Sequence, residues 1–114
     1  MVNKDYVPER GEIVWLDFDP QTGREQAGRR PALVITDSRY HRITRRGLFC
    51  PITSKVKGYP MEVLVSTGNI RGAILADHVK NLDWQARHAE SSGTMVDAEI
   101  MNTVRAHLAA LIGI

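Results

Sequence analysis

An arginine and a threonine, each close to a proline, are the clearest candidates for chemistry in this 114-residue sequence. Arg30 directly precedes Pro31, and a residue before proline is restricted to extended backbone. A guanidinium on such a rigid base offers a planar fork of donors, which suits a phosphate and can stabilise the added negative charge of a pentacoordinate phosphorus. A surface ion pair is the more common use of an exposed arginine, so Arg30 alone does not decide between these readings.

The second candidate is the run from Pro51 to Lys57, which brings two hydroxyls and two ammonium groups to the predicted exit of a strand. The hydroxyls of Thr53 and Ser54 can orient a phosphate oxygen. The same side chains cap turns routinely, so taken alone they are more often structural.

Histidines are the candidate acids and bases, because their unperturbed pKa lies near neutrality. His41 falls in a basic loop and His107 in a predicted helix, so neither is expected to act, and nothing singles out His88. His78 follows Asp77, whose carboxylate could orient it. A packed or solvated histidine remains the commoner alternative for His78.

Motifs of several large enzyme classes are absent. The sequence has no zinc or magnesium spacing, P-loop, dinucleotide fingerprint or serine-hydrolase elbow. Asp17 and Asp19 alternate along one predicted strand, but Pro20 favours a turn at Asp19. The sequence therefore predicts no metal and no other cofactor.

Charge is distributed unevenly along the chain, although the net charge is only +2. Residues 24–57 hold nine basic and two acidic side chains, a net +7, and the remainder holds six basic and eleven acidic ones, a net −5. A basic region of this kind suits a phosphate backbone or an acidic protein partner. Solvated loops whose arginines never converge are the remaining alternative.

The composition, 43% hydrophobic and 25% charged, is typical of a soluble globular protein, and the length fits one domain over residues 1–114. No stretch approaches the roughly 20 apolar residues that cross a bilayer, and the polar N-terminus lacks a signal-peptide core. We therefore expect a cytoplasmic protein without membrane contact. Cys50 is the only cysteine and lies in an apolar run, which predicts a buried thiol.

Short alternating segments predict a small β-barrel that would position these groups. Residues 12–19 place Val14, Leu16 and Phe18 on one face and Ile13 and Trp15 on the other, so both faces need cover. The other predicted strands are 31–36, 47–53, 61–65, 72–76 and a run over 78–82 that continues toward 87.

Polar connections are expected at 38–46 and 54–60, and Pro51 suggests an edge strand or a bulge. From about Met95 the apolar residues recur with a helical period, which predicts a C-terminal amphipathic helix. Asp97 and Glu99 fall in its first turn, and Gly113 stops it.

An ordered series of motifs extends over nearly the whole chain and resembles the MazF/PemK endoribonuclease toxins. Single residues of the series are Gly11 and Trp15. The longer blocks are Tyr6-Val7-Pro8, Asp17-Phe18-Asp19-Pro20, Gly23-Arg24-Glu25-Gln26-Ala27-Gly28-Arg29-Arg30-Pro31, Pro51-Ile52-Thr53, Lys57-Gly58-Tyr59-Pro60, Ala76-Asp77-His78-Val79-Lys80 and Trp84-Gln85-Ala86-Arg87. The order of these blocks is far more specific than any one of them.

The resemblance implies a mainly β fold with a C-terminal helix: a small SH3-like, CcdB/PemK-type barrel of about six to seven strands. It implies a homodimeric mRNA interferase, the toxin of a type II toxin–antitoxin system, that arrests growth. Such enzymes cut single-stranded RNA at short sequences without a metal and leave 2′,3′-cyclic phosphate and 5′-hydroxyl ends. An acidic antitoxin is the implied protein partner.

By the same resemblance, Arg30 matches the catalytic arginine, Thr53 the catalytic hydroxyl and Glu25 a loop glutamate proposed as a base. The positions expected to contact RNA are Gln26, Ser54, Lys57, Asp77, His78, Lys80 and Arg87. His78 and Gln85 depart from the usual family pattern, and the segment 39–46 looks private to this chain.

A non-enzymatic alternative on the same barrel is a gyrase-poisoning toxin that binds its target through the C-terminal helix. The tail from Leu111 to Ile114 superficially fits that alternative. Such a toxin does not need Arg30 and Thr53 within this series of motifs, so the sequence favours the RNA-cleaving enzyme.

Overall fold

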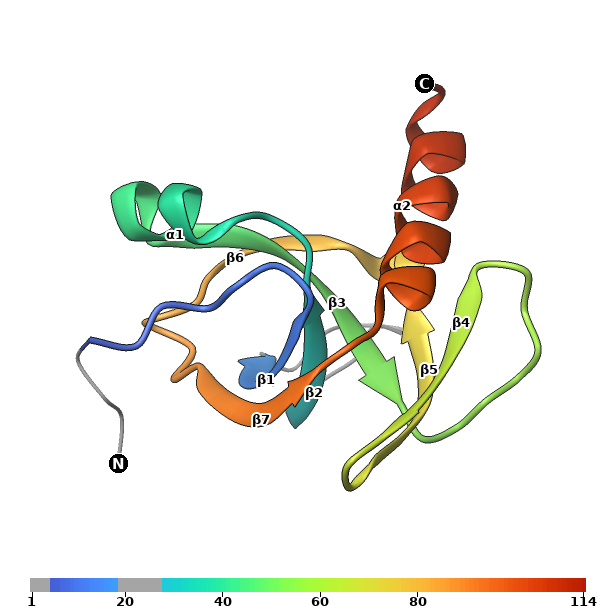
Figure 1. Cartoon of the computed structure of the whole chain (residues 1–114), viewed down its shortest axis with the longest axis horizontal. Helices are drawn as coiled ribbons and strands as arrows, with labels where there is room; N and C mark the ends of the chain where they lie inside the picture. The colour runs from blue at the N-terminus through green and yellow to red at the C-terminus, as the bar shows by residue number, and fades with distance from the viewer. Residues whose placement is uncertain (1–4, 19–27) are drawn as a thin grey trace.

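The computed structural model describes residues 5–18 and 28–114. Within these residues the chain forms seven strands, a short helix α1, a 3-10 turn η1 and a C-terminal helix α2 (Figure 1). The strands are β1 (Glu12–Phe18), β2 (Gly28–Val34), β3 (Arg46–Thr53), β4 (Glu62–Thr67), β5 (Ile70–Leu75), β6 (Lys80–Asp83) and β7 (Glu90–Met95). The helical elements are α1 (Ser38–Thr44), η1 (Ala76–His78) and α2 (Ala98–Ile112). The mainly β fold with a C-terminal helix is confirmed.

Strand β1 separates two apolar clusters, as its alternation predicts. Val14, Leu16 and Phe18 pack in one cluster with Phe49 and other residues of β2, β3 and the turn after β6. Ile13, on the opposite face, belongs to a second cluster that β4, β5 and α2 cover. The sheet must curl to bury both faces of β1, and it forms a half-barrel.

The central strand β3 changes partners along one edge. The strand order is β4-β5-β3-β2-β1-β7, and β6 also pairs with β3. On the edge away from β2, Phe49 pairs with Lys80 of β6, and Ile52 pairs with Ile74 of β5. Pro51 lies between these two contacts, in a stretch of that edge where neither β6 nor β5 pairs with β3. Because β3 is a central strand, an edge strand, one of the two expected alternatives for Pro51, is wrong.

Several sequence-based boundaries differ from the structure. The strand expected at 31–36 spans Gly28–Val34, that at 61–65 spans Glu62–Thr67 and that at 72–76 spans Ile70–Leu75. The strand expected over 78–82 begins only at Lys80, because Ala76–His78 forms η1 between β5 and β6. The chain after Asp83 is a turn rather than a strand toward 87. Strand β7 was not predicted, since Glu90–Met95 has little apolar character and forms by pairing with β1.

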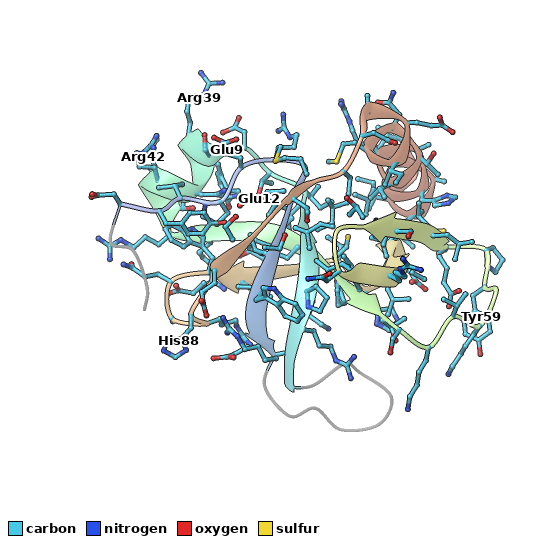
Figure 2. The ribbon with its side chains drawn as sticks, turned by 60° about the horizontal axis from the view of Figure 1, so that its bottom comes forward. Glu9, Glu12, Arg39, Arg42, Tyr59 and His88 are labelled. Carbon is cyan, nitrogen blue, oxygen red and sulfur yellow. The ribbon has the colours of Figure 1, made fainter. Side chains whose placement is uncertain are left out.

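The segment expected as a polar connection contains helix α1. Asp37 caps it by accepting a hydrogen bond from the Tyr40 N–H, and Arg45 ends it in the left-handed conformation. His41 is its one buried side chain, with Nδ1 at 2.7 Å from the Pro8 carbonyl oxygen and Nε2 at 2.6 Å from the Thr36 hydroxyl. Arg39 and Arg42 project outward from α1 (Figure 2). Burial of His41 therefore anchors the helix while its arginines face solvent.

Helix α2 begins three residues later than expected, because Asp97 is its N-cap and β7 precedes it. Met101 and Val104 are its buried residues and cover the cluster around Ile13. Gly113 ends it in the left-handed conformation, as predicted. In the described part of the chain, no helix is both long and apolar enough to span a bilayer.

Candidate active site

Arg30 and Thr53 lie close to the ends of neighbouring strands. The β2–β3 ladder pairs Ala32 with Pro51, and Arg30 and Thr53 each lie two residues beyond that pair on their own strand. Alternation of side chains along each strand predicts that both point to the side of Ala32 and Phe49. The two strands therefore bring the predicted catalytic residues near one another at their ends.

Thr53 is held firmly by its surroundings. It is 6% exposed, and its Oγ1 accepts a hydrogen bond from the Lys55 N–H at 3.1 Å. Strand β5 approaches its backbone so closely that a Cβ on Gly72 would lie 2.0 Å from the Thr53 carbonyl oxygen. Since Oγ1 uses a lone pair on Lys55, its hydroxyl hydrogen remains available to a ligand.

Two predicted RNA contacts are held by neighbouring strands. Lys80 pairs with Phe49 across β3 and β6, so its side chain lies on the same face of the sheet as Phe49. Arg87 is tied to the end of β1 by two contacts with Asp17. Its Nη1 donates to the Asp17 carbonyl oxygen at 3.1 Å, and its own carbonyl accepts from the Asp17 N–H at 3.0 Å.

The other described RNA-contact candidates are more scattered. Ser54 is exposed and, by alternation, on the opposite face from Thr53. Lys57 lies on the exposed segment after β3, with its Nζ 5.7 Å from the centre of the Tyr59 ring. Asp77 and His78 both lie in η1, with 4.0 Å between the His78 Nε2 and an Asp77 carboxylate oxygen. Glu25 and Gln26 lie outside the described residues.

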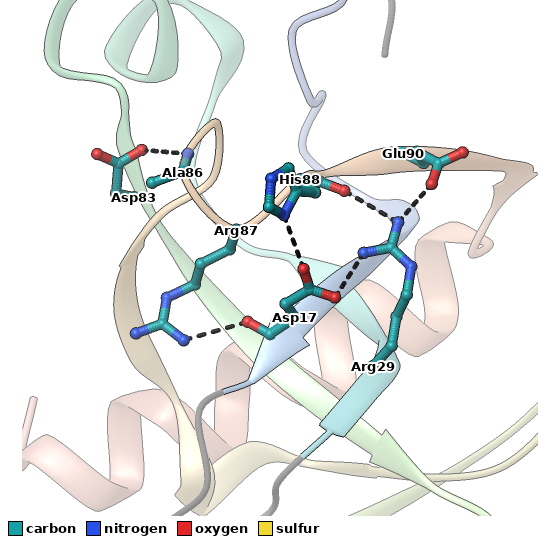
Figure 3. Close-up of polar contacts among 7 residues, drawn as sticks. All are labelled: Asp17, Arg29, Asp83, Ala86, Arg87, His88 and Glu90. Atoms are coloured by element: carbon teal, nitrogen blue, oxygen red, sulfur yellow. Dashed lines mark hydrogen bonds and ion pairs between the residues drawn. The ribbon is translucent and has the colours of Figure 1, made fainter. Parts of the chain in front are cut away.

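A polar cluster at the base of β1 and β2, which we call the Arg29 brace, consists of Asp17, Arg29, His88 and Glu90 (Figure 3). The Arg29 guanidinium donates to an Asp17 carboxylate oxygen at 2.9 Å, the His88 carbonyl oxygen at 2.9 Å and a Glu90 carboxylate oxygen at 2.6 Å. One side chain thus joins β1, β2 and the turn before β7. Because Arg29 is the neighbour of Arg30, the brace fixes the backbone from which Arg30 projects.

Asp17 is the acceptor at the centre of the brace. Its second carboxylate oxygen lies 2.8 Å from the His88 Nδ1. Hydrogen bonds from His88 and from Arg29 hold the pKa of the Asp17 carboxyl below its usual value, so it stays ionised at neutral pH. Sequence reasoning missed the brace. The only local signal was the β1–β2 register, which pairs Asp17 with Arg29.

Cys50 is unsuited to nucleophilic chemistry. It is fully buried, and burial raises the pKa of its thiol to about 12. The expected structural thiol is therefore confirmed. In residues 5–18 and 28–114, no three side chains of His, Cys, Asp or Glu gather in a way that could hold a metal ion.

Comparison with known proteins places this arrangement in a family. The sequence model described as "PemK-like, MazF-like toxin of type II toxin-antitoxin system" matches residues 9–112. The endoribonuclease toxin MazF of Escherichia coli K12 is 44% identical over 108 residues, covering 95% of this chain and 96% of that protein. The endoribonuclease PemK of Escherichia coli is 30% identical, covering 91% of this chain and 81% of that protein.

Solved structures agree with the sequence comparison. Form I of MazF from Deinococcus radiodurans superposes with a TM-score of 0.91 at 45% identity, covering 96% of this chain and 100% of that one. Form II of MazE-MazF from the same organism gives a TM-score of 0.84 at 42% identity, covering 96% and 99%.

Proposed function

The chain belongs to the PemK-like, MazF-like toxins of type II toxin–antitoxin systems, and from that membership we propose that it is an endoribonuclease acting at Arg30 and Thr53. The observation that supports the proposal is the pairing of β2 with β3, which puts these two residues near the ends of neighbouring strands. The gyrase-poisoning alternative is not favoured, because the matched curated relatives are named as endoribonucleases.

The reaction needs no group from the protein to become covalently attached to RNA. The ribose 2′-oxygen attacks the adjacent phosphorus, its proton leaves to a base, and the bond from phosphorus to the 5′-oxygen breaks. The 5′-oxygen takes up one proton, which gives a 2′,3′-cyclic phosphate and a 5′-hydroxyl. The protein must therefore align the phosphate, stabilise the phosphorane and move two protons.

Arg30 supplies the charge stabilisation in this proposal. Its guanidinium can form two parallel hydrogen bonds with the non-bridging phosphate oxygens, which carry more negative charge in the phosphorane than in the substrate. The hydroxyl of Thr53 donates a further hydrogen bond to the same phosphate. Arginine is a reluctant proton donor, with a reference pKa of about 12.5 or more, so proton transfer falls to other groups.

Glu25 and His78 are the proposed proton carriers. Glu25 matches the loop glutamate of the family and lies outside the described residues. His78 is half-buried in η1, which follows β5 along the same edge of β3. A carboxylate and an imidazole can each serve as base or acid in proton transfer.

RNA binding is proposed to follow the positive charge around Thr53. Lys80 lies opposite Phe49 of β3, Arg87 is bonded to the end of β1, and Lys57 lies on the segment that leaves β3. Phosphate contacts of this kind fix the strand without reading its sequence. Gln26, Ser54, Asp77 and His78 complete the set that the family pattern suggests.

An antitoxin is the proposed protein partner. The relatives of known structure include MazE-MazF from Deinococcus radiodurans, the toxin with its antitoxin. An acidic, partly disordered antitoxin segment would be attracted to the basic side chains of this chain and would compete with RNA for them. We also propose that the toxin is a homodimer and that RNA cleavage arrests growth by removing mRNA.

The test is cleavage of a long single-stranded RNA by purified protein in EDTA. Wild type should cut it to cyclic-phosphate ends, and Arg30→Ala should reduce cutting by at least about a thousandfold while keeping the fold. Arg105→Ala, an exposed arginine on α2, is the matched control and should cut normally. Intact RNA with folded wild type would disprove the proposal, and inhibition of gyrase supercoiling would then favour the alternative.

A further inference from the structure

A pocket of about 220 Å³ opens beside Arg30, at the start of β2 and the end of β3. Its walls come from β1, the start of β2, the end of β3 and the turn between β4 and β5. Pro31, Ile52 and Ile70 give it an apolar floor. None of the described groups assigned to phosphate binding, apart from Arg30 and Ser54, lines this pocket.

Three side chains on the rim of the pocket are Trp15, Asn69 and Arg71. Trp15 is 37% exposed, whereas Trp84 is 7% exposed and donates its Nε1–H to the His41 carbonyl. Within the described parts of the chain, neither the Asn69 amide nor the Arg71 guanidinium forms a side-chain hydrogen bond or an ion pair. The rim therefore carries a stacking surface and two polar groups that no internal contact uses.

We propose that this pocket binds one unpaired base of the RNA, adjacent to the phosphate that is cut. Trp15 stacks on the base, and Asn69 and Arg71 form hydrogen bonds with its edge. The proposal rests on the endoribonuclease function, and it makes these three residues determinants of the sequence at which the RNA is cut.

The chemistry of the pocket favours a base over a phosphate or a peptide. Single-stranded RNA is read mainly by splaying out bases, stacking them on aromatic rings and bonding to their edges. An apolar floor with an exposed indole suits a flat ring. An amide and a guanidinium supply the donors and acceptor that distinguish bases. Because Arg30 also lines the pocket, a base in it lies next to the reacting phosphate.

Cut-site mapping on a pool of randomised RNA tests the proposal. Wild type should prefer one base at a position next to the cut, and Asn69→Ala and Arg71→Ala should each reduce that preference about tenfold while total cleavage persists. Arg105→Ala removes an exposed arginine from α2 and should leave the preference intact. A uniform drop in rate at an unchanged preference would overturn the proposal.

Tryptophan fluorescence gives a second readout that does not depend on cleavage. An RNA with a 2′-deoxy nucleotide at the cut site lacks the nucleophile, so it binds without being cut. Binding should change the emission of wild type but not that of Trp15→Phe, in which only the buried Trp84 emits. Equal changes in both proteins would disprove stacking on Trp15.

The two proposals fail in different ways. If wild type cuts no RNA, the endoribonuclease function is wrong. If wild type cuts RNA and the variants keep its base preference, only the base pocket is wrong. If Arg71→Ala instead changes the molecular mass in solution, the pocket is a contact between copies of the chain, and the proposal is wrong as well.

Discussion

Arg29 and Arg71 line the same pocket but have opposite surroundings. Arg29 donates to three acceptors on three segments of the chain, and it holds the base of β2 in place. Arg71 is exposed on β5 and, among the described residues, has no internal acceptor. Two arginines that line one pocket thus have different roles. The donors of Arg29 form hydrogen bonds within the fold, and those of Arg71 are available to a ligand.

The internal contacts of a basic side chain in this molecule indicate whether it stabilises the fold or is available to a ligand. A guanidinium with all its contacts inside the protein stabilises the fold and is poorly available to RNA. Removing a guanidinium that projects over an apolar pocket should leave the stability of the fold unchanged but should weaken the binding of a ligand in that pocket. Substitutions that break internal contacts should therefore change stability first, and substitutions on the rim should change recognition alone.

The largest effect is expected from Gly72→Ala, which places a side chain where the rim meets Thr53. The new Cβ would lie 2.0 Å from the Thr53 carbonyl oxygen, so β5 and β3 must separate. We expect a loss of about 3 kcal/mol in the free energy of unfolding. RNA cleavage should fall more than tenfold even at temperatures where the protein stays folded. Urea unfolding and a cleavage assay measure both.

Gly93→Ala is the matched control for that prediction. Gly93 also has a positive φ, of 82°, but an added Cβ would meet no described atom within 4 Å. It should cost only about 1 kcal/mol, from backbone strain, and leave cleavage unchanged. Equal effects of the two substitutions would show that the close approach to Thr53 is unimportant.

The next largest effect is expected from Arg29→Ala. Loss of the three contacts should lower the free energy of unfolding by about 1–2 kcal/mol, a modest value because the side chain is partly exposed. The kcat for RNA cleavage should fall with little change in KM, since Arg30 loses a rigid base. Arg71→Ala should leave stability within about 0.5 kcal/mol of wild type. Comparable melting of the two variants would contradict the distinction between brace and rim.

Much of the fold followed from local patterns. Alternation in Glu12–Phe18 predicted two buried faces, and Val14, Leu16 and Phe18 are buried on one and Ile13 on the other, but Trp15, expected on the face of Ile13, is 37% exposed. Helix α2 was predicted from its apolar period and from Gly113, which ends it. These features rest on neighbouring residues, so their physical causes are visible in the sequence itself.

The missed elements depend on contacts between distant residues. Helix α1 has no apolar period, because its buried residue is His41, held by Pro8 and Thr36. Strand β7 is polar and exists only because β1 offers it an edge. The brace likewise joins Asp17 to His88, which lie 71 residues apart. No local propensity signals such contacts.

His41, unlike Arg29 and Arg71, is fully buried, and both of its ring nitrogens have hydrogen-bond partners inside the protein. Burial lowers the pKa of His41 below its usual value, despite the opposing hydrogen bond to Pro8. The unfolded chain therefore binds a proton near pH 6.5 that the folded chain resists. The contribution of His41 to stability should be constant above that pH and should decline below it, by at most ~1.4 kcal/mol per pH unit.

Urea midpoints between pH 5 and pH 8 measure this dependence. His41→Gln should flatten the acid limb of the curve, although it lowers stability at every pH. His107→Gln, on α2, is the matched control and should keep the limb. An identical acid limb in wild type and His41→Gln would assign the pH dependence to other groups.

The smallest effect is expected from His88→Gly, which tests whether Arg29 is the centre of the brace. His88 adopts the left-handed conformation, with φ of 56°, and glycine adopts that conformation with less strain than histidine. The lost hydrogen bond to Asp17 comes from an imidazole that is 66% exposed, so it contributes little. Because Arg29 bonds to the backbone carbonyl of residue 88, that contact survives the substitution. The melting temperature should stay within about 3 °C of wild type, and cleavage should be unchanged.

His88→Ala separates the contribution of the imidazole to stability from that of the left-handed backbone at this position. It removes the same imidazole but keeps a Cβ on a left-handed residue, so it should be about 1 kcal/mol less stable than His88→Gly. If His88→Gly instead loses as much stability and activity as Arg29→Ala, the imidazole is essential to the brace. The hydrogen bond between the His88 imidazole and Asp17 would then hold the backbone of residue 88 in place. The position of Arg30 would depend on that bond as much as on the contacts of Arg29.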